Sequence, residues 1–220
     1  MSWMVDMSTK QSQYIPALSF RWLTPLYDPL LKWGMREETF KRHLIERAHI
    51  QADQRVLDLG CGTGTLTIML KRSSPKATIT GVDGDEEVLS IAKSKAEQAN
   101  VEITWDHVLA YDLPYSDNSF DIVISSLVIH HLISEDKIRV FREVRRVLRP
   151  GGGFHILDFG RPFGLFTRIQ SSMMNGLEEA ADNFHGRILP MLQESGFNAA
   201  FESEHMNSIF GPIWFYETLK

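Results

Sequence analysis

The chain has 220 residues, of which 43% are hydrophobic and 23% are charged, a balance typical of a globular domain of ordinary size. Its formal net charge of −5 and its pI of about 5.9 argue against a nucleic-acid backbone as the main partner. It has no apolar run of membrane-spanning length and no signal-peptide pattern at its start, so we expect a cytoplasmic protein without a membrane span.

The first 35 residues are unusually rich in aromatic side chains for a polar tail. Two interpretations stand side by side: a lid or pocket wall over a bound acceptor, and packing onto the edge of the fold. The aromatic residues concerned are Tyr14, Phe20, Trp22, Tyr27 and Trp33.

Beyond this segment, strand and helix patterns alternate, which predicts a mostly parallel sheet covered by helices on both faces. Ser134 is the expected N-cap of one helix, and the glycines after Pro150 are expected to end that helix. Residues 163–195 have a mostly helical pattern. The other expected helices cover 36–49, 64–72, 85–98 and 134–148, and the expected strands cover 55–59, 77–82, 101–105, 121–125, 153–158, 199–205 and 208–216.

The most informative stretch is VLDLGCGTG at residues 56–64, where an apolar strand enters a turn with glycine at every second position. Glycine allows a ligand to approach the backbone closely and adopts positive φ without strain. The helix that follows would point its unpaired N–H groups at that ligand. The third glycine of the dinucleotide fingerprint is missing, which disfavours NAD, and a tight turn without a ligand is the remaining alternative.

A second acidic strand end supports the ligand interpretation. Asp83 ends the strand at 79–82 and lies nineteen residues after Gly64. That separation is close to the one at which a carboxylate hydrogen-bonds a ribose diol. The pattern therefore favours an adenosine-containing ligand.

The pair VLDLGCGTG and ITGVD resembles the class I S-adenosylmethionine-dependent methyltransferases. The blocks LPYSDNSFDIVISSLVIHHL (113–132) and EVRRVLRPGGGFHILDFG (143–160) look like the fourth-strand and fifth-strand regions of that family. Together they are similar to the small-molecule group that includes ubiquinone and menaquinone C-methyltransferases.

The resemblance implies an α/β, Rossmann-like, doubly wound and mostly parallel sheet with a C-terminal antiparallel edge hairpin and an N-terminal helical cap. It also implies one methyltransferase domain over residues 1–220. Within it, residues 1–35 would be the aromatic cap or lid, 36–160 the cofactor-binding core, and 161–220 a helical insertion with edge strands.

The cofactor implied by the resemblance is S-adenosylmethionine, with the glycine loop under its methionine and ribose parts and Asp83 on the ribose hydroxyls. Asp58 is expected to orient loop N–H groups or to accept from the methionine ammonium, unless it is only a strand-end residue. The family's adenine-binding Asp is replaced in this chain, so the adenine would rest near Leu109 and Ala110, with Asp106 as an alternative partner. The expected cofactor-binding residues are Asp58, Gly60, Cys61, Gly62, Gly64, Asp83, Gly84, Leu109, Ala110 and Ser125.

Cys61 is the only cysteine, so no intrachain disulfide is expected. We interpret it as a small residue filling a tight loop rather than as a nucleophile, because no histidine is near it in sequence. Asp158-Phe-Gly160 matches the kinase magnesium motif, but the other kinase motifs are missing, so no metal site is expected.

His130 and His131 follow the fourth strand, where an open α/β sheet exposes its ligand crevice, and are candidate bases. The alternative is that both are structural, and Tyr27 and Asp28 are lesser candidates. We expect methyl transfer to a small-molecule acceptor, apolar or aromatic, with a non-catalytic S-adenosylmethionine-binding module as the alternative function. The residues expected to line the acceptor's other wall are Phe163, Phe166, Met173, Met174, Phe184 and His185.

Overall fold

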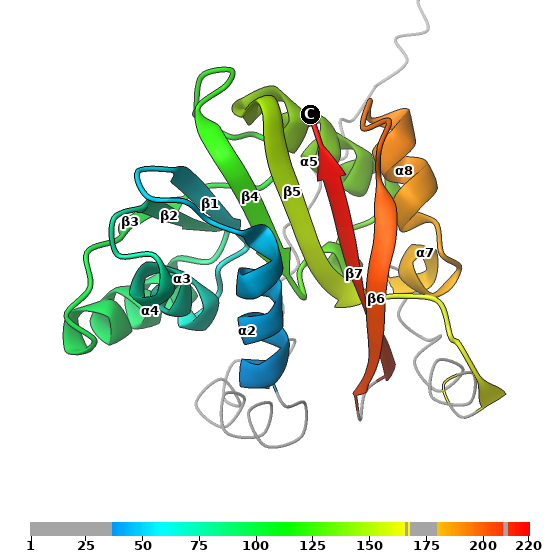
Figure 1. The fold of residues 1–220 in the computed structure, drawn as a ribbon, viewed down its shortest axis with the longest axis horizontal. Coiled ribbons are helices and arrows are strands. Elements are labelled where there is room, and N and C mark those ends of the chain that lie inside the picture. Colours follow the sequence, from blue (N-terminus) through cyan, green and yellow to red (C-terminus); the bar gives the residue numbers. More distant parts are fainter. Residues whose placement is uncertain (1–36, 166, 168–179, 209–210) are drawn as a thin grey trace, which may run out of the picture.

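The structure, a computed structural model, describes residues 37–165, 167, 180–208 and 211–220, and its centre is a seven-stranded sheet (Figure 1). The strand order is β3-β2-β1-β4-β5-β7-β6. β1 to β5 are parallel to one another, and β7 is antiparallel to both β5 and β6. The predicted Rossmann-like sheet with a C-terminal antiparallel hairpin is confirmed. The predicted N-terminal cap lies outside the described residues.

Strands and helices alternate in the order that a doubly wound sheet requires. The strands are β1 (Arg55–Leu59), β2 (Thr78–Asp83), β3 (Thr104–His107), β4 (Phe120–Ser126), β5 (Leu148–Phe159), β6 (Phe201–Ser208) and β7 (Gly211–Leu219). The helices are α2 (Glu37–Ala48), α3 (Thr65–Ser73), α4 (Glu86–Gln98), α5 (Ser134–Val147), α7 (Ala181–Phe184) and α8 (Ile188–Glu194), with a 3-10 turn, η2, at Ile129–His131. None of these described helices has the length and hydropathy needed to cross a membrane.

Two hydrophobic clusters cover the two faces of the sheet. Successive strand residues point to opposite faces, so Leu57 of β1 belongs to the cluster under α5 and α8, whereas Val56 belongs to the cluster under α2 and α3. Phe141 of α5 and Phe40 of α2 are almost fully buried on their respective sides. The sheet is therefore held from both faces, and its strand ends are left to form a site.

Several predicted boundaries are wrong by a few residues. β3 starts at Thr104 rather than at residue 101, because Val101 still bonds to the end of α4 while Thr104 is the first residue in register with β2. β5 starts at Leu148, inside the predicted helix, and runs through the glycines, because Leu148 pairs with Phe120 of β4 and Gly152 bonds to Lys220. β6 and β7 lie two to three residues further along the chain than predicted.

Of the residues 163–195 that were predicted to be mostly helical, the described part holds α7 and α8. The predicted N-cap role of Ser134 is wrong. Ile133 is the N-cap of α5, and the Ser134 hydroxyl donates instead to Asp182 at 2.5 Å. By contrast, Asp85 caps α4 by accepting from the N–H groups of Glu87 and Val88.

Candidate functional site

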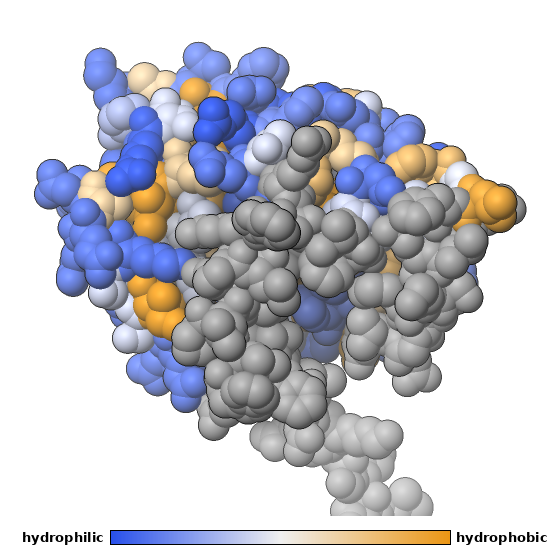
Figure 2. Space-filling model, turned by 90° about the horizontal axis from the view of Figure 1, so that it is seen from below, coloured by the Kyte–Doolittle hydropathy of each residue, from blue (hydrophilic) through white to orange (hydrophobic). Residues whose placement is uncertain are grey.

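The candidate site lies at the edge of the sheet where the parallel strands end. The carboxyl ends of β1, β2, β4 and β5 meet there, at the bottom of Figure 1, and Figure 2 looks onto that edge. Three of these strands carry an acidic residue at or near the end: Asp58, Asp83 and Asp158. Open α/β sheets bind ligands outside these strand ends, so this edge is the candidate site.

The glycine loop is a tight turn between β1 and α3. Gly60, Gly62 and Gly64 have φ values of +71°, +52° and +76°, the left-handed region that glycine adopts without strain. The N–H groups of Gly60 and Cys61 both donate to the carbonyl of Val82 at 2.9 Å. These bonds fix the loop against the end of β2.

The three glycines have different surroundings. A Cβ at Gly60 would lie 2.5 Å from Val128, and a Cβ at Gly64 would lie 2.7 Å from Trp105. Among the three, only Gly62 would have no atom of the described residues within 4 Å of an added Cβ. We expected all three positions to admit a ligand, whereas two of them make room for protein side chains. The open face above Gly62 is the place where a ligand can rest on the loop.

Asp83 connects the loop to the end of β2. Its Oδ2 accepts from the Gly62 N–H at 2.8 Å, and its Oδ1 accepts from the Asp85 N–H at 3.0 Å. Burial raises the pKa of Asp83, although these backbone N–H groups partly oppose the rise. Each carboxylate oxygen has capacity for a second hydrogen bond, so the geometry fits a vicinal diol such as that of a ribose.

Asp58 is buried beneath the loop, with 1% of its surface exposed. The Thr67 hydroxyl of α3 donates to its Oδ2 at 2.6 Å. Burial raises the pKa of Asp58 to about 6, against the opposing effect of the Thr67 hydrogen bond. Asp58 therefore anchors the first turns of α3 to β1, and its carboxylate would be favoured by a cation placed over it.

Other predicted cofactor residues have structural partners. The Ser125 hydroxyl, fully buried, donates to the carbonyl of Leu59 at 3.1 Å. The Gly84 carbonyl lies 3.0 Å from Nε2 of His107. Cys61 is buried, and burial raises the pKa of its thiol. A protonated thiol is a poor nucleophile, which agrees with its interpretation as a small loop residue.

Leu109 and Ala110, on the expected adenine side, are partly buried in the turn that follows β3. The carbonyl of Leu109 accepts from the N–H of Asp112, and Asp106 accepts from the Tyr115 hydroxyl at 2.6 Å. Sequence reasoning missed Trp105, which packs against the position of Gly64 from beside this turn. No local pattern connects Trp105 with Gly64, because the two residues are far apart in the sequence.

His130 and His131 form most of η2, directly after β4. His130 is buried, with Nδ1 2.7 Å from Oδ1 of Asp158, and its ring packs edge-on against Phe159. The ring of His131 lies 4.0 Å from that of His130, and burial, together with the charge of His130, lowers the pKa of His131 to about 4. The two neighbouring histidines therefore have different environments.

Asp158, which was set aside as a chance match to a kinase motif, is the centre of this region. Its Oδ2 accepts from the N–H groups of Val128, Ile129 and His130 at 3.1, 2.7 and 3.4 Å. Burial would raise the pKa of Asp158, but His130 and the Phe159 N–H outweigh it, and the pKa lies below its usual range. The sequence signal that we overlooked was an acidic residue at the end of a strand, as at Asp58 and Asp83.

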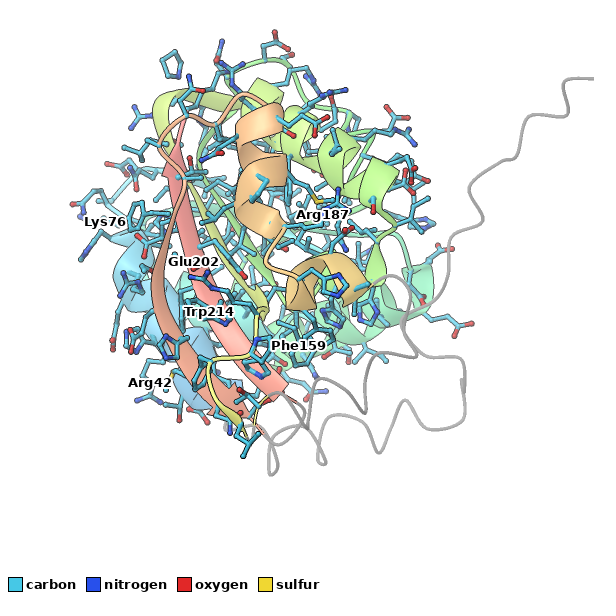
Figure 3. The ribbon with its side chains drawn as sticks, turned by 90° about the vertical axis from the view of Figure 1, so that its right-hand side faces the viewer. Arg42, Lys76, Phe159, Arg187, Glu202 and Trp214 are labelled. Atoms are coloured by element: carbon cyan, nitrogen blue, oxygen red, sulfur yellow. The ribbon has the colours of Figure 1, made fainter. Side chains whose placement is uncertain are left out.

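Aromatic and apolar side chains border the site beyond β5. The His205 ring lies between Phe163 and Trp214, at 4.1 and 4.6 Å. Phe163 is 40% exposed and Leu165 is 78% exposed. Figure 3 shows Trp214 and Phe159 at the same end of the sheet, and Figure 2 shows hydrophobic surface at its right margin, where the segment after β5 lies.

The other residues that were predicted to line the acceptor pocket differ in burial. Phe184 is buried against Phe159, and His185 is exposed. Phe166, Met173 and Met174 lie outside the described residues, as do Tyr27, Asp28 and the aromatic residues before position 36.

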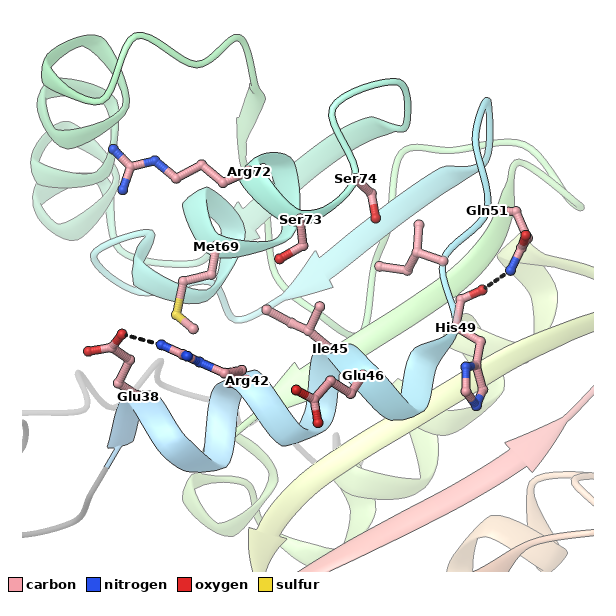
Figure 4. A pocket seen from close by; sticks show the side chains of 11 residues that line it. Glu38, Arg42, Ile45, Glu46, His49, Gln51, Met69, Arg72, Ser73 and Ser74 are labelled. Carbon is pink, nitrogen blue, oxygen red and sulfur yellow. Dashed lines mark hydrogen bonds and ion pairs between the residues drawn. The ribbon is translucent and has the colours of Figure 1, made fainter.

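A groove of about 690 Å³ lies elsewhere, between α2 and α3 (Figure 4). Met69 and Arg72 line it from the second half of α3, and the Arg42 side chain, bonded to Glu38 at 2.8 Å, lines it from α2. The glycine loop is at the opposite end of α3. The groove is therefore not the site at the strand ends.

Comparisons with known proteins agree with this geometry. A family model for the methyltransferase domain matches residues 56–152. Demethylmenaquinone methyltransferase of Thermus thermophilus is 34% identical over 157 residues, which are 68% of this chain and 70% of the relative. The Listeria monocytogenes enzyme of the same name is 30% identical over 213 residues, covering 81% of this chain and 85% of the relative.

Solved structures support the fold. The YcgJ protein of Bacillus subtilis is 27% identical with a TM-score of 0.64, over 77% of this chain and 72% of that one. Phosphoethanolamine N-methyltransferase 2 of Haemonchus contortus, solved with S-adenosylhomocysteine and phosphomonomethylethanolamine, has a TM-score of 0.71 at 18% identity, over 90% of this chain and 57% of that one. The open face above Gly62 and the paired carboxylate oxygens of Asp83 fit an adenosine-containing methyl donor. The chain belongs to the S-adenosylmethionine-dependent methyltransferases, the family that its glycine loop and the strand ending at Asp83 resemble.

Proposed function

We propose that this methyltransferase acts on a small apolar or aromatic acceptor of the quinone type. The observation that carries the proposal is the exposed apolar surface just after β5, formed by Phe163 and Leu165, with Phe163 packed against the buried Trp214. Exposed apolar side chains beside a binding site favour an apolar ligand. The names of the 30–34% identical relatives, which are demethylmenaquinone methyltransferases, support the same class of acceptor.

The cofactor residues are part of the proposal. Gly62 offers the open backbone surface, Asp83 offers carboxylate oxygens for the ribose hydroxyls, and Asp58 offers a buried negative charge near the loop for the methionine ammonium. The turn at Leu109 and Ala110 would border the adenine. When bound, the cofactor supplies a methyl group on a sulfonium, and the electrons of the broken bond stay with the sulfur. The protein's own task is then to position the acceptor and to take up any proton that it loses.

Transfer of a labelled methyl group tests the proposal. The purified protein is incubated with labelled S-adenosylmethionine and a reduced demethylmenaquinone with a short tail, and in parallel with phosphoethanolamine as a polar amine acceptor. We expect label in the extracted quinone and none in the phosphoethanolamine. Transfer to phosphoethanolamine alone, or to neither acceptor while S-adenosylhomocysteine still binds, would overturn the quinone-type acceptor.

A further inference from the structure

The short segment between β4 and α5 carries both candidate bases and adjoins the cofactor loop. Val128, two residues before His130, occupies the space that the missing side chain of Gly60 leaves. The same segment is bonded through three successive N–H groups to the carboxylate of Asp158 at the end of β5. One carboxylate therefore fixes the position of the histidines relative to the glycine loop.

Asp158 also fixes the tautomer of one histidine. An ionised carboxylate can only accept hydrogen bonds, so at 2.7 Å from Oδ1 of Asp158 the Nδ1 atom of a neutral His130 carries the hydrogen. The lone pair is then on Nε2, which has no hydrogen-bond partner in the described part of the chain. An imidazole in this state can accept a proton at Nε2, and a carboxylate on the other nitrogen stabilises the imidazolium that forms.

His131 lacks this arrangement. It has no carboxylate on its ring among the described residues, and it is packed against the ring of His130. Asp158 on β5 is the charged group that acts on both histidines, and Lys137 on α5, which interacts with Asp158, is itself paired with Asp182 of α7 at 3.4 Å. The structure therefore distinguishes His130 from His131 as candidate bases, whereas the sequence does not.

We propose that Asp158 is a positioning residue that makes His130, and not His131, the proton acceptor for methyl transfer. The inference rests on the proposed function, since it requires an acceptor that loses a proton. As the acceptor's nucleophilic atom gains the methyl group, its own hydrogen leaves as a proton and forms an N–H bond with Nε2 of His130. The positive charge that results is offset by Asp158, and the proton later returns to solvent.

The first test uses the wild-type protein without turnover. Two-bond 1H–15N spectra distinguish the histidine tautomers, and His130→Gln assigns the His130 signal while keeping Asp158. We expect neutral His130 with its hydrogen on Nδ1. A hydrogen on Nε2 of His130 would overturn the inference, whatever the activity.

The second test measures methyl transfer against pH. For Asp158→Asn we expect turnover to fall by about 10²-fold or more, with unchanged affinity for S-adenosylhomocysteine, and the acidic limb of the pH profile to move to lower pH. His130→Gln should lose that limb, and the double variant should be no slower than His130→Gln alone. His131→Gln should keep the limb and most of the rate.

Asp182→Asn is the matched control, because Asp182 is another buried carboxylate that accepts from Ser134 and Lys137 but does not touch His130. It should lower thermal stability while the position of the limb stays unchanged. The inference would be overturned, with the proposed function intact, by either of two results. One is an Asp158→Asn variant with the wild-type turnover and acidic limb, and the other is an equal loss of turnover in His130→Gln and His131→Gln. No methyl transfer by the wild type to any acceptor would instead overturn the proposed function, and the catalytic role of His130 with it.

Discussion

The Oδ2 atom of Asp83 accepts a hydrogen bond from the backbone N–H of Gly62 at 2.8 Å, which joins the carboxylate at the end of β2 to the open position of the glycine loop. Gly62 and Asp83, two of the residues that we assign to the cofactor, are thus parts of one hydrogen-bonded unit. A change at either residue acts on the ligand directly and also on the other residue.

Asp83→Ala should weaken binding of S-adenosylhomocysteine by about 1.5–3 kcal/mol, the size of a hydrogen bond to a charged group. Asp83→Asn should lose less, because its amide still makes hydrogen bonds. Isothermal titration measures both. The control is Asp85→Ala, which removes the cap of α4 and should cost about 1 kcal/mol of stability without changing the affinity. If a folded Asp83→Ala variant binds S-adenosylhomocysteine with normal affinity, Asp83 does not hydrogen-bond the ribose.

Gly62→Ala should separate cofactor binding from folding. Its methyl group meets no atom of the residues that the structure describes, so the cost to stability is about 1–2 kcal/mol for the left-handed φ of +52°. The methyl group would project into the space assigned to the ligand, so affinity for S-adenosylhomocysteine should fall roughly tenfold or more, about 1.4 kcal/mol.

Gly151→Ala has the same kind of strain, with φ of +75° and no atom near its Cβ, and should bind normally. Gly60→Ala should instead lose about 2–4 kcal/mol of stability, because its methyl group overlaps Val128. Chemical denaturation and titration on the three variants give the comparison. Equal affinities for Gly62→Ala and Gly151→Ala would contradict a ligand on Gly62.

His131 should make stability depend on pH. Its pKa is about 4 in the folded protein, lowered by burial first and by His130 second, and about 6.5 when unfolded. Its contribution is therefore fully present above pH 6.5 and is lost as pH falls toward 4, by about 2–3 kcal/mol. The difference in unfolding free energy between wild type and His131→Gln, measured from pH 7.5 to 4, should shrink by that amount. A constant difference would show that His131 is not buried in its neutral form.

Leu165→Ser should raise KM for a quinone-type acceptor several-fold while affinity for S-adenosylhomocysteine stays unchanged, because Leu165 is an exposed apolar side chain in the segment that we propose contacts the acceptor. Leu219→Ser is the matched control, since Leu219 is 59% exposed at the other end of the sheet. Steady-state kinetics with a short-tailed quinol measures both. The acceptor does not contact this border if the two variants have the same KM.

The elements that the sequence predicts well are those whose signals are local. β1, the glycine loop and Asp83 follow from an apolar run, a glycine spacing and one separation along the chain. The start of β5 does not, because its pairing of Leu148 with Phe120 joins residues that are far apart in sequence. The neighbours of the glycines are equally non-local: Val128 fills the space at Gly60, and no spacing rule connects the two.

In the candidate site, the sequence indicates that His130 and His131 are candidate bases but gives no reason to prefer one of them. What distinguishes His130 is Asp158, which lies twenty-eight residues further along the chain and reaches His130 through the pairing of β5 with β4. The resemblance of Asp158-Phe-Gly160 to a kinase motif carries no information about this role, whereas the position of Asp158 near the end of β5 does. Position in the sheet, more than the letters around it, was the useful signal.

The order of the last two strands has a consequence for how the chain folds. β6 is made before β7, yet it lies outside β7 and pairs with no other described strand. Until residues 211–219 have left the ribosome, β6 has nothing to pair with and β5 keeps an open edge. Such edges pair readily with other chains. We therefore expect nascent chains that lack β7 to need chaperone protection. When β7 is added, it pairs with β5 on one side and with β6 on the other, so it covers the open edges of both strands at once.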